Sequence, residues 1–276
     1  MSKLECQQVS PKRQNEGLWA TLAKTHIAGT MLPKHRHQTG QLVFATSGVM
    51  LVETQFARWT VPPQRALWIP PAHEHAVRIL SDTVLRTVYC QSELIAQSAP
   101  NAHLHEVHAV VVSPLTRELV LGLFDYQFDR TTRHTMVCLL LQTLRQTPGL
   151  STYLPLPSSP GLYRAITQML ETKQWQLQMH EIADMAAVSE RTFSRRFTKE
   201  VGLNYRIWRQ RARIIASLDL LASNRSIKSI AIALQFASAA AYIAAFHSIL
   251  GCTPNAFRIE NAGHEIKATI SPLVKS

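Results

Sequence analysis

Cysteine is scarce in this chain, and long apolar runs are absent from it. The four cysteines (Cys6, Cys90, Cys138 and Cys252) are widely separated and form no Cys-x-x-Cys pair. This argues against a disulfide framework and fits a reducing cytoplasm with small buried thiols. No stretch approaches the roughly 20 apolar residues of a membrane span, and the first residues lack the apolar run of a signal peptide. We therefore expect a cytoplasmic protein without a membrane partner.

Acidic residues are also few relative to basic ones. The 276 residues include 29 Lys and Arg against 18 Asp and Glu, which gives a net charge of +11. Between Arg191 and Arg213 the only acidic residue is Glu200. This surplus favours a polyanionic partner, although charge alone does not separate a nucleic acid from a membrane surface. With 46% hydrophobic residues, the chain can build two compact domains, and we do not expect a disordered chain.

Residues 40 to 90 have the pattern of a small β-structure. Short β-branched or aromatic runs alternate there with turn signals such as Gly48 and two Pro-Pro pairs. Several short strands at this spacing predict a sandwich or barrel. Residues 116–124 and 132–147 then carry apolar residues at helical intervals, and a proline-rich stretch over 154–161 predicts a linker. The pattern is helical from Leu162 to about Glu260.

The helical part contains an internal duplication. A set of aromatic and glycine positions recurs after a constant offset of 49 residues, and each copy fits two helices joined by a tight turn. The matched pairs are Phe193 and Tyr242, Phe197 and Phe246, Gly202 and Gly251, and Trp208 and Phe257.

The first copy predicts a helix that reads DNA. Ser189 stands where an N-cap is needed, residues 190–200 form the next helix, and Phe193 and Phe197 give that helix a buried face. Its other face suits the major groove, because an arginine can donate two hydrogen bonds to guanine. The alternative interpretation is that these charged residues only form a solvent-exposed helix face. Their position in a duplicated helix-turn-helix unit favours DNA binding. The candidate contacts are Arg191, Thr192, Ser194, Arg195 and Lys199.

A long connecting helix is predicted over residues 204–222, about 28 Å in length. Such a connector can hold two recognition helices about one DNA turn, roughly 34 Å, apart. Four arginines on this helix are available for DNA phosphates: Arg206, Arg209, Arg211 and Arg213.

This part of the chain resembles the AraC/XylS family of bacterial transcription regulators. The resemblance implies that Arg191, Ser194 and Arg195 read bases from the first recognition helix. Gln235 stands in a turn where the family usually has glycine, and Tyr205 replaces a common proline. The residues that carry the resemblance are Ile182-Ala183, the run 189–197, Gly202, Ala231, the run 241–246 and the run 251–257. In the second recognition helix the reading positions are Ala239, Ala240, Ile243 and Ala244, which can at most contact thymine methyl groups.

A histidine cluster marks the N-terminal half. His35 and His37 are two residues apart, so on one strand they would point the same way, and Gln41 would share their parity if the strand continued. Together with His75, their spacing resembles the two cupin motifs, whose corresponding positions bind metal in cupin enzymes, although Gln41 replaces the expected glutamate. Three imidazoles can hold Zn, Ni, Cu or Fe. The alternative is a remnant pocket whose histidines are hydrogen-bonded or contact an organic effector.

These observations predict an α+β fold. A cupin-like β-barrel sensor is expected over residues 1–110 and a helical dimerisation segment with a linker over 111–161. An all-α DNA-binding domain with two helix-turn-helix units is expected over 162–260, followed by a tail over 261–276.

The expected function is sequence-specific regulation of transcription under the control of a small-molecule or metal effector. In the family that the chain resembles, this is commonly activation. The expected partners are double-stranded promoter DNA, RNA polymerase and a second copy of the chain. The rival is a metal-dependent cupin oxygenase or isomerase with a helical appendage; the glutamine at position 41 and the duplicated basic unit argue against it. No catalytic residue is assigned, and no cofactor beyond the possible transition metal.

Overall fold

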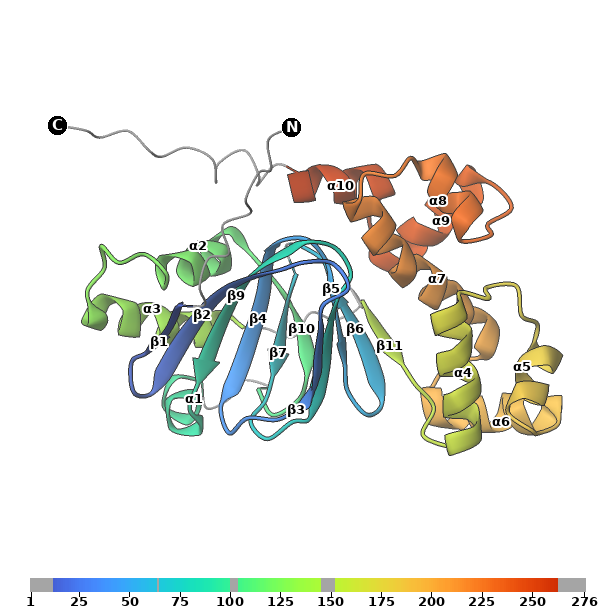
Figure 1. The fold of residues 1–276 in the computed structure, drawn as a ribbon, viewed down its shortest axis with the longest axis horizontal. Helices are drawn as coiled ribbons and strands as arrows, with labels where there is room; N and C mark the ends of the chain where they lie inside the picture. Colours follow the sequence, from blue (N-terminus) through green and yellow to red (C-terminus); the bar gives the residue numbers. More distant parts are fainter. Residues whose placement is uncertain (1–11, 64, 100–103, 145–151, 263–276) are drawn as a thin grey trace, which may run out of the picture. The chain divides into compact units, whose positions relative to one another are not determined.

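The computed structural model describes residues 12–63, 65–99, 104–144 and 152–262 (Figure 1). The chain divides into two compact units. The first combines residues 1–51 with 61–147, and the second combines residues 52–60 with 148–276. None of the helices in the described ranges is both long and apolar enough to cross a bilayer.

The larger sheet has six strands in the order β1-β2-β9-β4-β7-β10, and its neighbouring strands are antiparallel. It confirms the β-rich N-terminal domain that the alternation of short apolar runs predicts. The strands are β1 (Lys12–Asn15), β2 (Trp19–His26), β4 (Gly40–Ser47), β7 (Arg65–Ile69), β9 (Thr83–Cys90) and β10 (His108–Val111).

The second sheet has five strands in the order β11-β6-β5-β8-β3. Strand β11 pairs antiparallel with β6, and the backbone N–H of Leu156 donates to the carbonyl oxygen of Phe56 at 2.9 Å just beyond it. The expected linker over 154–161 is therefore wrong in part, because it begins with strand residues and ends inside a helix that starts at Pro160. The strands are β3 (Met31–His35), β5 (Met50–Glu53), β6 (Ala57–Val61), β8 (His75–Ile79) and β11 (Tyr153–Pro155).

Three helices belong to the first unit: α1 (Ser92–Ser98), α2 (Pro114–Gly122) and α3 (Arg130–Thr143). Val120 of α2 and Val137 of α3 share one buried core with Trp19 and Trp68 of the six-stranded sheet. The apolar side of α3 therefore faces the sheet, although Leu139 remains 40% exposed. Dimer contact through these helices stays a prediction.

The C-terminal part is helical, as the 3.6-residue period predicts. Local signals set its boundaries: the Ser189 side chain accepts a hydrogen bond from the Thr192 backbone N–H at 3.3 Å, and Asn204 caps the long helix in the same way. One continuous core holds the two helix-turn-helix units together. The helices are α4 (Pro160–Thr172), α5 (Met179–Met185), α6 (Glu190–Val201), α7 (Tyr205–Ala222), α8 (Ile227–Ala233), α9 (Ala239–Leu250) and α10 (Pro254–Ala262).

Candidate functional site

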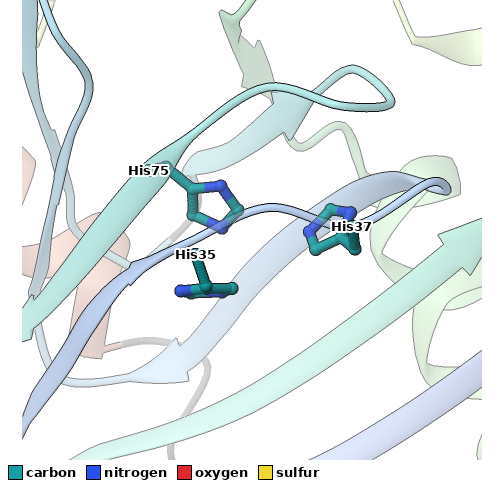
Figure 2. Close-up of side chains that lie close together, drawn as sticks. All are labelled: His35, His37 and His75. Atoms are coloured by element: carbon teal, nitrogen blue, oxygen red, sulfur yellow. The ribbon is translucent and has the colours of Figure 1, made fainter.

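Three histidines from two neighbouring strands and a loop converge in the first unit (Figure 2). His35 ends β3 and pairs across the strands with His75, the first residue of β8, so that their ring centroids lie 4.3 Å apart. His37 lies beyond the strand, in the connection from β3 to β4. Its carbonyl oxygen accepts a hydrogen bond from the Ala72 N–H at 2.8 Å, which holds this connection beside the turn that leads to His75.

The structure thus brings the predicted histidines together, but the parity argument for them is wrong. Positions 35, 37 and 41 do not share one strand, because β3 ends at His35 and Gln41 lies on the next strand, β4. His37 reaches the cluster because the loop folds back, and no alternation of side chains is involved.

Each imidazole is tethered through Nδ1 to a backbone carbonyl two residues away. The acceptors are the carbonyl oxygens of Pro33, Thr39 and His73, at 2.8 Å from His35, 2.6 Å from His37 and 3.0 Å from His75 respectively. Because a carbonyl oxygen only accepts, Nδ1 is the donor in each contact. In His35 and His75 this leaves the Nε2 lone pair for a metal ion, whereas His37 Nε2 lies 2.7 Å from the side-chain oxygen of Gln41.

His75 is the buried member of the cluster. It is 1% exposed, and its Nε2 atom is buried without a hydrogen-bond partner. Burial lowers the pKa of His75 to about 4, with smaller contributions from His35 and His37 in the same direction. The ring is therefore neutral at physiological pH, which is the form that coordinates metal ions.

The spacing of the three rings can be compared with that of a metal centre. One candidate ligand nitrogen from each ring lies within 4.8 Å of the other two. Two nitrogens bound tetrahedrally to one zinc ion at about 2.0–2.1 Å each lie about 3.3–3.4 Å apart. If both rings move, a shift of less than about an ångström in each nitrogen would reach this spacing, so the donor set fits a transition-metal ion.

Gln41 and Tyr89 form the wall of the cluster on the side of the six-stranded sheet. They are directly opposite each other on β4 and β9, and Gln41 is buried. The Gln41 amide lies 2.7 Å from His37 Nε2 through one terminal atom and 3.3 Å from the Tyr89 hydroxyl through the other. Sequence reasoning missed Tyr89, because the strand register that puts it beside Gln41 leaves no local signal in the sequence.

The first recognition helix, α6, has the surface that was expected of it. Phe193 and Phe197 are fully buried, whereas Arg191, Arg195 and Lys199 are exposed. Thr192 and Ser194 are half-buried, and the Thr192 hydroxyl accepts a hydrogen bond from the hydroxyl of the N-cap Ser189 at 3.0 Å. Arg196 is exposed as well, so the exposed surface of α6 carries four cations, three of them arginines.

The second recognition helix, α9, has the same buried side and a different exposed one. Tyr242 and Phe246 are fully buried. Its four predicted reading positions are apolar: Ala240, Ile243 and Ala244 are exposed and Ala239 is half-buried. The exposed polar residues of α9, His247 and Ser248, lie in its last turn. This helix therefore offers methyl groups where α6 offers guanidinium groups.

The four arginines of α7 differ in what their side chains contact. Arg206 is exposed. Arg209 donates to the carbonyl oxygen of Leu177 and lies over the Tyr205 ring, 5.6 Å from its centroid. Arg213 donates Nε–H to the carbonyl oxygen of Leu234 at 2.8 Å and stacks on Phe236 at 3.8 Å.

Burial lowers the pKa of the fourth arginine, Arg211. Through the hydrogen bonds described above, Arg209 links α7 to the loop before α5, and Arg213 links α7 to the end of α8. Among the four arginines of α7, Arg206 is the exposed one, so its guanidinium group is accessible to a partner.

Comparisons with known proteins agree with this arrangement. A family model described as an AraC-like ligand binding domain matches residues 23–145, and a model described as a helix-turn-helix domain matches residues 182–259. The chain is 28% identical to the HTH-type transcriptional regulator NimR of Escherichia coli (strain K12) over 261 residues, which cover 93% of each protein.

Two solved structures are also similar. ToxT from Vibrio cholerae, with an unsaturated fatty acid bound, covers 90% of this chain and 97% of its own at 12% identity and a TM-score of 0.36. The DNA-binding domain of AdpA, in complex with a target DNA, covers 40% of this chain and 99% of its own at 28% identity and a TM-score of 0.37.

The two matched regions divide the molecule as its architecture does. The ligand-binding model spans the strands that carry the three histidines together with α2 and α3, and the helix-turn-helix model spans α6 to α9. The chain therefore belongs to the AraC family of transcription regulators.

Proposed function

We propose that this regulator binds a specific promoter site chiefly through its first helix-turn-helix unit and that it activates transcription in the cytoplasm by contacting RNA polymerase. The exposed arginines of α6 support the first part, because a bidentate arginine–guanine pair distinguishes bases more strongly than a methyl contact does. Arg206 is the proposed phosphate contact of the connector. A second copy of the chain would bind the neighbouring half of the site.

An electrophoretic shift assay tests the DNA-binding part. The full chain is mixed with the DNA upstream of its own gene in the presence of excess unrelated competitor. We expect a complex that survives the competitor and whose site contains guanine in the segment read by α6. A protein that binds all sequences equally, or none, would contradict the proposal.

We further propose that the effector is a divalent transition-metal ion held by His35, His37 and His75. The observation that carries this proposal is the buried Nε2 atom of His75, which has no hydrogen-bond partner and belongs to a ring that stays neutral. Burying an imidazole nitrogen without a partner costs free energy, and a bound cation would remove that cost. When bound, the cation would supply positive charge and link β3 to β8.

Metal analysis tests the effector. The chain, purified without chelators, is analysed for metal and titrated with Zn²⁺, Ni²⁺ and Co²⁺, and its DNA affinity is compared with and without the ion. We expect up to one ion per chain and loss of binding in His37→Ala. His73→Ala is the matched control, because His73 is an exposed neighbour that adds no ring nitrogen to the cluster. Failure to take up any of the three ions would leave an organic ligand as the effector and would contradict the metal proposal.

A further inference from the structure

A polar cleft in the second unit is lined by residues of both helix-turn-helix units. It has a volume of about 540 Å³, and its walls come from the segment before α5, from α5 itself, from α7 and from the turn between α8 and α9. The histidine cluster belongs to the first unit, so the cleft is a separate feature of the molecule.

Positive charge in this cleft is not neutralised. Arg209 and Arg213 are four residues apart on α7 and therefore share one side of the helix. Neither has a carboxylate oxygen within 4.0 Å among the described residues. Glu181 also lines the cleft, but its carboxylate accepts from the Gln178 backbone N–H at 2.7 Å. Burial lowers the pKa of Arg213, and the positive charge of Arg209 lowers it further.

The Arg213 guanidinium is held in place and still has donors to offer. Its Nε–H donates to the Leu234 carbonyl oxygen at 2.8 Å, and its plane stacks on Phe236 at 3.8 Å. Its two terminal amino groups have no hydrogen-bond acceptor among the described residues. A guanidinium fixed in this way is suited to an oxyanion, because it presents several N–H donors in one plane.

A third donor in the wall of the cleft also lacks an acceptor. Trp175 lines the cleft and is 3% exposed, and its Nε1 atom is buried without a hydrogen-bond partner. An indole N–H can only donate, and leaving it unpaired inside the protein costs free energy. The amides of four glutamines add further donors to the lining. Two unpaired cations and an unpaired N–H together favour an anionic ligand rich in acceptor oxygens.

We propose that this cleft binds a phosphate-type oxyanion between Arg209 and Arg213. Such a group can belong to the DNA backbone or to a free phosphate-bearing molecule, and both sources offer the same oxygens to the guanidinium groups. A DNA phosphate would make the cleft a backbone contact in addition to Arg206. A free oxyanion would make it a second ligand site, independent of the three histidines.

The first arm of the test uses inorganic phosphate and the unfolding midpoint of the full chain, with sodium chloride added to keep the ionic strength constant. A ligand site gives a saturable rise in the midpoint, whereas the general stabilisation by phosphate does not saturate. We expect Arg213→Gln to raise the half-saturating phosphate concentration about 10-fold, the effect of losing one charge-assisted hydrogen bond. Arg164→Gln is the matched control, because it removes an exposed arginine of α4 outside the cleft.

The second arm identifies the source of the oxyanion by measuring DNA affinity against salt concentration. If a DNA phosphate fills the cleft, Arg213→Gln should lower the log-log salt slope by about 1, and inorganic phosphate should compete with DNA. If a free oxyanion fills it, the slope should stay unchanged while the saturable phosphate effect is lost in Arg213→Gln. Arg164→Gln should match the wild type in both measurements.

The proposal is overturned if Arg213→Gln, folded by circular dichroism, changes neither the phosphate effect nor the salt slope. If this variant is poorly folded, Arg213→Lys decides, because it keeps the charge and loses the planar pair of donors. We expect a smaller loss in Arg213→Lys, and wild-type behaviour in both arms overturns the proposal. If the chain binds no DNA, the phosphate arm decides alone, so failure of the proposed DNA-binding function is distinguished from failure of the oxyanion site.

Discussion

The two helix-turn-helix units have the same interior and different exteriors. In both, a serine caps the recognition helix by accepting from the backbone N–H three residues later, at 3.3 Å in the first unit and 3.1 Å in the second. Both recognition helices end at a glycine in the left-handed conformation, and both bury an aromatic pair one helical turn apart. At the predicted base-reading positions, the exposed side chains are basic in α6 and apolar in α9.

This comparison separates the residues that specify the fold from those that specify the DNA sequence. Caps, turns and buried aromatic residues were retained in both copies, since each is needed to close the same local structure. The exposed positions are free of that requirement, so one copy carries Arg191 and Arg195 where the other carries Ala240 and Ala244. Equal stability with unequal base discrimination is the expected result.

The largest effect should come from the shared interior. Phe197→Ala and Phe246→Ala each remove a fully buried ring that packs edge-on against another aromatic, at 5.5 Å from Trp208 and 5.7 Å from Phe257 between centroids. Each should lower the free energy of unfolding of its own unit by about 3–5 kcal/mol. Native-state hydrogen exchange of the amides in α6 and α9 measures the two losses separately.

Leucine at the same two positions provides the control. Phe197→Leu and Phe246→Leu keep much of the buried volume, so their losses should be smaller and again similar to each other. If the free energy of unfolding falls several times more in one unit than in the other, the two interiors are not energetically equivalent.

The next largest effect concerns the exteriors. Arg195→Ala should lower the affinity for the preferred site by about 5- to 150-fold and relax specificity at one or two base pairs, because a bidentate arginine–guanine pair is worth about 1–3 kcal/mol. Ile243→Ala in the second unit should have a smaller effect. Relative affinities for every single-base variant of a bound site measure both.

Arg195→Lys keeps the charge without the planar pair of donors and therefore isolates base reading from charge. We expect it to lose specificity while retaining much of the salt-dependent affinity. If the base preferences survive Arg195→Ala, the proposed division of base reading between the two units is wrong. It is also wrong if the largest losses of affinity fall in the DNA segment read by α9.

The helical units could be predicted from sequence because their signals are local. Ser189, Phe193 and Phe197 act within one helix, and their roles as cap and core are as predicted. The histidine site depends on which strands are neighbours and in which register, and these features depend on contacts between distant segments. This is why Tyr89 was missed. Strand β11 was missed because it is short and two of its three residues lie in a proline-rich stretch that is typical of a linker.

The smallest effect concerns the turns. Ala187 and Gln235 hold equivalent places between the two helices of their units, and both have positive φ angles, 55° and 59°. This conformation costs an L-residue roughly 1–2 kcal/mol, whereas glycine adopts it freely but loses more entropy on folding. Ala187→Gly and Gln235→Gly should therefore each raise the free energy of unfolding by about 0.5–1 kcal/mol, measured by urea denaturation.

Gln235 needs a second variant, because its side chain lines a polar cleft together with Arg209 and Arg213. Gln235→Ala removes the amide and keeps the left-handed backbone strain, so it should not gain the stability that Gln235→Gly gains. If the alanine variant is as stable as the glycine variant, the amide rather than the backbone is the unfavourable element at this turn. If Gln235→Gly is less stable than the wild type while Ala187→Gly is more stable, the second turn depends on its glutamine. The two turns would then differ in what stabilises them, and the glutamine that replaces the family's usual glycine would have a structural role.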